Sequence, residues 1–202
     1  MSKPVFLASQ SPRRLELLRQ LGALPSVLHL RGAANRQEVD ETPLASELAV
    51  EYVMRVALMK AAAGVRAQRE RGLPDLPIIA ADTTVTIDGQ ILGKPADAEE
   101  AAAMLRTYAG REHTVLTAVA VAYKESVRSA LNESTVRFKA LSEAEIAAYI
   151  ACGEPFDKAG GYGVQGRAAM FIERLCGSYT GVMGLPLFET SELLREAGYP
   201  LL

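Results

Sequence analysis

The sequence is poor in the side chains that bind soft metals or form disulfide frameworks. Its 202 residues include two histidines, His29 and His113, and two cysteines, Cys152 and Cys176. The cysteines have neither metal-ligand spacing nor a disulfide pattern, which is typical of reduced thiols in a cytosolic protein. The shortage of histidine excludes a histidine-rich metal site. Any catalytic metal would therefore need oxygen ligands, which predicts Mg²⁺ or Mn²⁺.

The sequence also lacks long apolar runs and an excess of basic residues. No apolar stretch approaches the ~20 residues of a membrane span. Pro12, Arg13 and Arg14 interrupt the N-terminal apolar run, unlike a signal peptide. The net charge is −2, so no basic surface indicates a nucleic-acid polymer as partner. We therefore expect a cytoplasmic protein that binds neither a membrane nor a nucleic-acid polymer.

Strand and helix patterns alternate along one predicted domain, residues 1–202. Hydrophobic residues make up 49% of the chain, enough for a sizeable core. Asp88 and Gly89 predict a two-residue hairpin, and Glu51 precedes Arg55 by four residues, which favours an ion pair on a helix. The hairpin argues for an α/β fold with a mixed twisted sheet and flanking helices. We expect strands at 5–8, 26–31, 78–81 with a continuation into the hairpin, 113–123, 129–141 and 168–175; helices from Pro12, at 47–63, from Asp97, from Ser142 to about Cys152 and at 187–197; and loops at 32–42, 158–166 and 177–186.

The start of the chain predicts a helix with an unusual charge. Ser11 followed by a proline is typical of a helix N-terminus. Arg13 and Arg14 then stand at the positive end of the helix dipole, where acids are normally favoured. Together with Ser9, Ser11 and the free backbone N–H groups, these guanidinium groups suit a phosphate. The alternative is a capped helix with two solvated arginines.

Four charged residues are candidates for chemistry. Asp82 follows a buried strand, and a partly buried carboxylate is unfavourable unless it is paired or bound to a metal. The alternative is a hydrogen-bonded Asp at a strand kink. Glu41 lies in an acidic loop, and such a loop is often only solvated. Lys60 and Lys94 are single cations, and each by itself is more typical of the surface than of a site.

A glycine-rich segment at 158–166 indicates special backbone angles or the close approach of another group. Lys158 supplies a positive charge, and the amide of Gln165 can both donate to and accept from a base edge. The alternative is a tight connection without a ligand. His113 opens a strand with no obvious partner, which favours a structural role.

Five segments occur in the order found in one known family. The segments are SQSPRR after a strand, AADTTV with GKP, GREHTVLTAV, GEPFDKAGGYGVQG and GSYTGVMGLP. Together they resemble the Maf family of nucleoside triphosphate pyrophosphatases, over about residues 7–194. The resemblance implies a fold similar to that of the inosine triphosphate pyrophosphatases, with two lobes around a cleft. It also implies hydrolysis of a nucleoside triphosphate to the monophosphate and pyrophosphate, a divalent cation and a homodimer.

The resemblance assigns roles to the charged candidates. Asp82 matches the family's general base, and Glu41 matches its loop glutamate, so these two carboxylates are the expected metal ligands. Lys60 and Lys94 match the two family lysines near the phosphates. In such a site the metal neutralises the triphosphate, Asp82 orients the attacking water, and the cations stabilise the leaving pyrophosphate.

The resemblance also assigns the substrate-binding residues. Ser9, Arg13 and Arg14 fall in the family's phosphate-binding turn, and Lys158 lies in the glycine-rich loop. Arg13, Thr83 and Gln165 match the branch that acts on dTTP and UTP, with CTP and modified pyrimidine nucleotides as further candidates.

Two other functions are weighed against this one. The branch that acts on 7-methyl-GTP has a bulky aromatic at the position of Arg13 and lacks the glycine-rich loop. A nucleotide-binding regulator of cell division or septum formation would need the phosphate site but not the base, so Asp82 with Glu41, Lys60 and Lys94 favours catalysis. Pyrophosphate release from a panel of nucleotides would separate the three.

Overall fold

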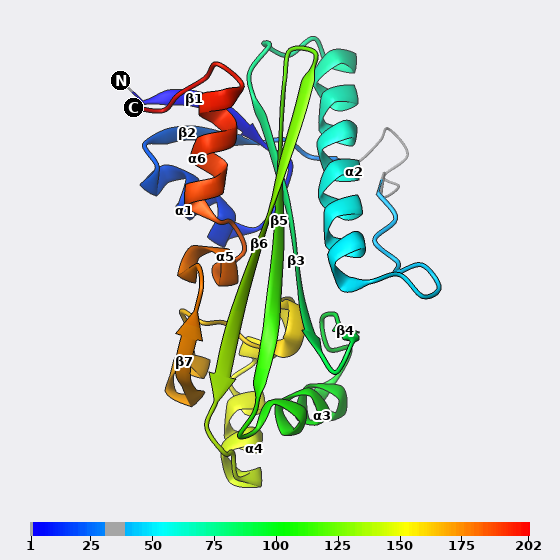
Figure 1. The fold of residues 1–202 in the computed structure, drawn as a ribbon, viewed down its shortest axis with the longest axis vertical. Helices are drawn as coiled ribbons and strands as arrows, with labels where there is room; N and C mark the ends of the chain where they lie inside the picture. The colour runs from blue at the N-terminus through cyan, green and yellow to red at the C-terminus, as the bar shows by residue number, and fades with distance from the viewer. Residues whose placement is uncertain (1, 31–38) are drawn as a thin grey trace.

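The fold is built on one seven-stranded mixed sheet, seen in a computed structural model that describes residues 2–30 and 39–202 (Figure 1). The strand order is β2-β1-β3-β5-β6-β7, and β4 pairs with β3. β1 is parallel to β2 and β3, whereas the other pairs are antiparallel. The predicted mixed sheet is therefore confirmed. The strands are β1 (Lys3–Leu7), β2 (Ala23–Val27), β3 (Ile78–Ile87), β4 (Gln90–Leu92), β5 (Glu112–Tyr123), β6 (Ser126–Phe138) and β7 (Ile172–Cys176).

Helices cover both faces of the sheet, as expected (Figure 1). α2 packs on one face, while α1 and α6 pack on the other, and α3 and α4 lie toward the far end of the long strands. The α-helices are α1 (Pro12–Gln20), α2 (Ala49–Glu70), α3 (Ala98–Tyr108), α4 (Glu143–Ala151), α5 (Tyr179–Met183) and α6 (Leu187–Glu196), and short 3₁₀ turns span Glu154–Asp157, Ala159–Gly161 and Arg167–Phe171. None of the helices in the described part of the chain is both long enough and apolar enough to span a bilayer.

Side chains alternate along a strand, so the apolar run of β3 sends residues to both faces of the sheet. Helices cover both faces, and the run is therefore buried on each. Ile79 and Ala81 belong to the core formed with α1 and α6, whereas Ile78 and Ala80 belong to the core formed with α2. The second core is rich in alanine, and Gly64 of α2 has Ile78 Cγ2 only 2.8 Å from where its Cβ would lie. Small residues on both sides therefore let α2 approach the sheet closely.

Local signals set most element boundaries. Ser11 caps α1 by accepting a hydrogen bond from the Arg14 N–H, and Ser142 with Glu145 forms the expected capping box of α4. Asp97 caps α3 by accepting from the Glu100 N–H at 2.9 Å. At the predicted hairpin, Asp88 and Gly89 have φ values of 52° and 77°, as the favoured two-residue turn requires.

Several boundaries differ from the predictions because tertiary contacts outweigh local signals. The strand expected at 26–31 is β2, which begins at Ala23 because it pairs with β1, and Pro25 is tolerated because β2 is an edge strand. The helix expected at 47–63 runs on to Glu70 through Gly64, which packs on β3.

The prediction of a strand at 168–175 is wrong for the first half of this segment. Residues there form a 3₁₀ turn, because the Glu154 carboxylate accepts the N–H groups of Arg167 and Ala168 at 2.9 and 3.5 Å, and only then does β7 begin. The loop expected at 177–186 contains α5. The loop expected at 32–42 lies largely outside the described residues.

Candidate active site

The middle of β3 has a stretch where the sheet is paired on one side only. β1 pairs with β3 at Ile78 and Ile79, and β4 pairs with it from Val85 onward. Between these partners, residues 80–84 are paired only with β5 among the described strands. Asp82 and Thr83 lie in this stretch, just beyond the carboxyl end of the parallel strand β1. Ligands of α/β sheets commonly bind at the carboxyl ends of such strands.

On the α2 face of this stretch, Lys60 joins the two predicted metal ligands. Its Nζ donates to Asp82 Oδ1 at 2.8 Å and to Glu41 Oε2 at 2.9 Å. The side chains of Lys60 and Asp82 are 11% and 8% exposed, and that of Glu41 is 40% exposed. Asp82 Oδ2 is buried and has no hydrogen-bond partner among the described residues. The structure therefore brings together three of the predicted residues and leaves one carboxylate oxygen available.

This carboxylate pair fits a hard cation that also binds substrate. Among the described residues, no group of three or more His, Cys, Asp or Glu side chains could hold a metal ion. Mg²⁺ is usually bound through one or two carboxylates together with substrate phosphates and water, so it does not need such a group. Asp82 Oδ1 and Glu41 Oε2 both accept from Lys60 Nζ, so the two carboxylates converge on one point, as ligands of such an ion do.

On the opposite face of β3, Arg14 contacts two other predicted substrate-binding residues, Ser9 and Thr83. It donates through Nε to the Gly184 carbonyl at 2.7 Å, through Nη1 to Ser9 Oγ at 3.3 Å and through Nη2 to Thr83 Oγ1 at 3.1 Å. A guanidinium has five N–H donors, so these three contacts leave donors for a ligand. Burial lowers the pKa of Arg14, whereas the nearby Asp82 carboxylate raises it.

Asp82 and Thr83 connect these two clusters. Because they are consecutive in a strand, their side chains point to opposite faces, toward Lys60 and toward Arg14 respectively. Thr117 of β5 lies directly opposite Thr83, and its hydroxyl is 3.0 Å from Thr83 Oγ1 and 2.8 Å from the Gly181 carbonyl oxygen. Nothing in the sequence pointed to Thr117, whose neighbours only indicate a central strand.

Arg13 contacts a different partner from Arg14. Its Nη1 lies 3.2 Å from Asp157 Oδ2, and Asp157 also pairs with Lys158, whose Nζ donates to the Glu154 carbonyl at 2.8 Å. Asp157 thus links two predicted substrate-binding cations from distant parts of the chain. Sequence reasoning missed Asp157, although it stands directly before Lys158 in the glycine-rich motif.

The glycine-rich loop packs against the segment that carries Lys94. The Gly160 N–H donates to the Gly93 carbonyl at 2.8 Å. Lys94 and Gln165 are both exposed, and neither makes a polar contact with another predicted site residue in the part of the chain that the structure describes. The contact between Gly93 and Gly160 therefore places Lys94 beside the loop.

His113 has the structural position favoured by the sequence. Its Nε2 lies 2.7 Å from the Tyr162 hydroxyl, and its ring contacts Tyr108 and Phe138. Burial lowers the pKa of His113 to about 4, so the ring is neutral at physiological pH. This aromatic cluster anchors the glycine-rich loop through Tyr162.

Gly160→Ala is expected to destabilise the fold by about 2–4 kcal/mol, since it adds both backbone strain and overpacking. Gly160 has φ +72°, and Val85 Cγ2 lies 2.5 Å from where its Cβ would be. Urea unfolding measures the loss. Gly153→Ala is the matched control, because Gly153 has φ +77° but no atom within 4 Å of that position. Equal losses in the two variants would show that the contact with Val85 is unimportant.

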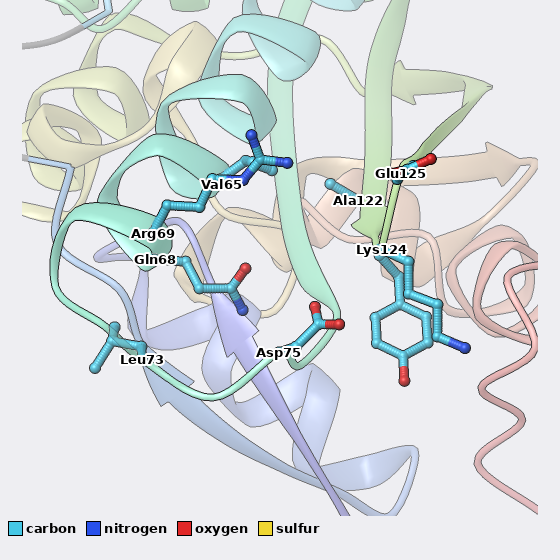
Figure 2. Close-up of a pocket in the computed structure, with 9 residues that line it drawn as sticks. Val65, Gln68, Arg69, Leu73, Asp75, Ala122, Lys124 and Glu125 are labelled. Carbon is cyan, nitrogen blue, oxygen red and sulfur yellow. The ribbon is translucent and has the colours of Figure 1, made fainter.

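A separate open groove lies at the end of α2 and the β5–β6 hairpin (Figure 2). It has a volume of about 620 Å³, and its lining includes Gln68, Arg69, Asp75, Lys124 and Glu125. None of the predicted site residues lines it. A second cavity, of about 500 Å³, is lined by residues 39–43 and so includes Glu41.

The chain belongs to the Maf family. The model of this family, described as Maf-like protein, matches residues 4–197. Similar proteins are the dTTP/UTP pyrophosphatases of Aromatoleum aromaticum, at 54% identity over 98% of this chain and 97% of that protein, and of Cupriavidus metallidurans, at 54% identity over 98% of each. The dTTP/UTP pyrophosphatase of Nitrosomonas europaea is 52% identical over 96% of this chain and 94% of that protein.

Among solved structures, the Ham1 protein of Staphylococcus aureus aligns with a TM-score of 0.47 and 13% identity. The alignment covers 67% of this chain and 72% of that one.

Proposed function

We propose that this protein is a metal-dependent nucleoside triphosphate pyrophosphatase that acts on dTTP and UTP. The observation that carries the proposal is the buried, unpartnered Oδ2 of Asp82, whose other oxygen accepts from Lys60, with Arg14 bound to the adjacent Thr83 on the opposite face of β3. A base with a free oxygen beside positive groups suits hydrolysis of a phosphoanhydride. The preference for pyrimidine nucleotides is supported by the relatives. They are named dTTP/UTP pyrophosphatases and align with this chain over nearly their full length.

In the proposed reaction, water breaks the α–β phosphoanhydride and yields the monophosphate and pyrophosphate. Asp82 accepts the proton of the attacking water on Oδ2, while Lys60 holds Oδ1 and keeps the carboxylate oriented. Arg14 and the Ser9 hydroxyl bind phosphate oxygens, and the positive charge of Arg14 offsets the charge that develops on the leaving group. Arg13, Lys158 and Lys94 provide further positive charge around the polyphosphate.

Asp82 and Glu41 are the residues that would hold the metal. A bound Mg²⁺ or Mn²⁺ would neutralise phosphate charge and lower the pKa of water. Lys60 pairs with both carboxylates, and its positive charge offsets their mutual repulsion.

A nucleotide panel tests the proposal. Purified protein with Mg²⁺ or Mn²⁺ is expected to release pyrophosphate from dTTP and UTP faster than from GTP, ATP or 7-methyl-GTP, and to lose activity when EDTA is added. Preferred hydrolysis of 7-methyl-GTP would assign the other branch of the family. Nucleotide binding without any hydrolysis would instead support a regulator.

Two further properties go with this proposal. We expect a homodimer, which light scattering of the purified protein would detect, and a cytoplasmic location, which fractionation of cells would test.

Gln165→Ala is expected to reduce kcat/KM for dTTP and UTP by roughly 5- to 150-fold, about 1–3 kcal/mol, and to affect purine triphosphates less. The exposed amide of Gln165 can both donate to and accept from a pyrimidine edge, and a site that hydrogen-bonds its substrate discriminates against others. Kinetics on the same nucleotide panel measure the change. Gln20→Ala, at an exposed position of α1, is the control. An equal proportional loss on every nucleotide would place Gln165 in phosphate binding or loop structure.

A further inference from the structure

The loop that carries Glu41 is held to α2 through its backbone. The Tyr52 hydroxyl donates to the Glu41 carbonyl oxygen at 3.1 Å. Arg55 Nη2 donates to the carbonyl oxygen of the next residue, Thr42, also at 3.1 Å. Two consecutive carbonyl groups are thus bound by side chains of one helix. These contacts involve the backbone, so they are separate from the Lys60 contact with the Glu41 carboxylate.

Arg55 is itself held in place by an acid from the same loop. Glu47 accepts from Arg55 Nε at 2.6 Å and from Nη2 at 2.7 Å, and its Oε2 also accepts the Leu44 N–H at 3.0 Å. The Glu47 side chain is only 6% exposed. Hydrogen bonding to Arg55 lowers the pKa of Glu47 to about 2, so the pair stays charged.

The predicted ion pair between Glu51 and Arg55 is therefore wrong. Glu51 instead accepts the Leu48 N–H at 3.2 Å and caps the start of α2. Arg55 Nη1 lies 3.6 Å from Met59 Sδ of the same helix, while its Nε and Nη2 donate to the loop, where Glu47 and the Thr42 carbonyl offer three acceptor atoms. A bidentate carboxylate in a largely buried position outweighs an exposed pair spaced by four residues.

The helix also carries the lysine that contacts the Glu41 carboxylate. Tyr52, Arg55 and Lys60 lie on successive turns of α2 and all bind the segment at residues 41–42 or its Glu47 anchor. The helix fixes the spacing of these three residues along its backbone. The position of Glu41 relative to Lys60 and Asp82 is consequently set by how firmly its backbone is bound to α2.

We propose that Tyr52 and Arg55 are positioning residues that place the Glu41 carboxylate for the reaction. The inference rests on the proposed function, in which Glu41 and Asp82 act together on the nucleotide. Neither Tyr52 nor Arg55 touches the reacting atoms in this arrangement. Their effect on activity passes through Glu41, and this separates a positioning role from a general contribution to stability.

A double-mutant cycle tests this dependence. Arg55→Ala is expected to lower kcat/KM for UTP roughly 10- to 100-fold and Tyr52→Phe roughly 2- to 10-fold, from the hydrogen bonds each removes. In a Glu41→Ala background, each should change the remaining activity less than about twofold, because the carboxylate they position is gone. Tyr52→Phe removes one hydroxyl, so it remains informative if Arg55→Ala does not fold.

Arg106→Ala is the matched control. Arg106 also forms a bidentate pair, with Glu143 at 2.8 and 2.7 Å, but it joins α3 to α4. It should leave kcat/KM unchanged in both backgrounds. Equal proportional losses from Arg55→Ala with and without Glu41 would overturn the proposal, since they would show that Arg55 acts on the structure as a whole. Full activity of both single variants would also overturn it.

Hydrogen exchange provides a readout that does not depend on catalysis. The Thr42 and Leu44 N–H groups donate to Asp40 and Glu47, so they report the order of the loop. Amides of residues 39–47 should exchange roughly 5-fold faster or more in Tyr52→Phe and Arg55→Ala, and no faster in Arg106→Ala. Unchanged exchange would overturn the positioning role. Wild-type protein that hydrolyses no nucleotide would refute the proposed function instead, and the exchange result would still decide whether the loop is held by α2.

Discussion

Asp82→Asn is expected to reduce turnover of UTP by about 10²- to 10⁴-fold, the usual contribution of a general base. The substitution removes the proton acceptor at Oδ2 and keeps an oxygen for Lys60, which now lies 2.8 Å from Oδ1. Steady-state kinetics measure the loss, and circular dichroism checks that the fold is intact.

Asp88→Asn is the matched control for this substitution. Asp88 is an exposed carboxylate in the β3–β4 hairpin, paired with Arg111, and asparagine tolerates its positive φ of 52°. It should keep full activity. If Asp82→Asn retained more than about a tenth of wild-type turnover, Asp82 would not be the base.

Arg14→Ala is expected to lower kcat/KM for UTP by about 2–4 kcal/mol, roughly 30- to 1000-fold, because in the proposed site it removes the partly buried positive charge that binds phosphate. It should also reduce the free energy of unfolding, since the Gly184 carbonyl, Ser9 and Thr83 lose the donor that joins them. Kinetics and urea unfolding measure the two effects separately.

Two other substitutions in α1 show how that result should be interpreted. Arg19→Ala removes an exposed arginine near the end of α1 and should change neither quantity. Arg13→Ala should weaken nucleotide binding with little loss of stability, because its ion-pair partner among the described residues, Asp157, is exposed. Unchanged kinetics in both Arg13→Ala and Arg14→Ala would mean that this turn binds no phosphate.

Elements marked by local chemistry were predictable from the sequence. The Ser11 and Ser142 caps and the Asp88-Gly89 hairpin depend on residues within one turn of each other, so their sequence signals are complete. Boundaries that depend on distant partners were not. Helix α2 passes through Gly64 because β3 packs there, and residues 167–171 form a 3₁₀ turn because Glu154 takes their N–H groups.

The site divides in the same way. The residue types and motif order identified Asp82, Glu41, Lys60 and the SQSPRR turn as candidates, and the structure joins Asp82 to Glu41 through Lys60. The partner of Arg55 could not be read from spacing, because Glu47 reaches it from a loop rather than from the helix. Thr117 and Tyr52 carried no signal of their own, since each acquires its role from a residue on another element, and the contact of Asp157 with Arg13 likewise joins distant parts of the chain.

The sequence by itself determined the mixed α/β class and the family, because these follow from caps, turns and ordered motifs. Only the tertiary structure decided which charges meet. Strand β3 sends Asp82 to one face and Thr83 to the other, and the alanine-rich packing of α2 brings Lys60 within hydrogen-bond distance of Asp82. Contacts between elements far apart in the chain depend on how closely those elements pack, and that distance is set by side chains from both of them together.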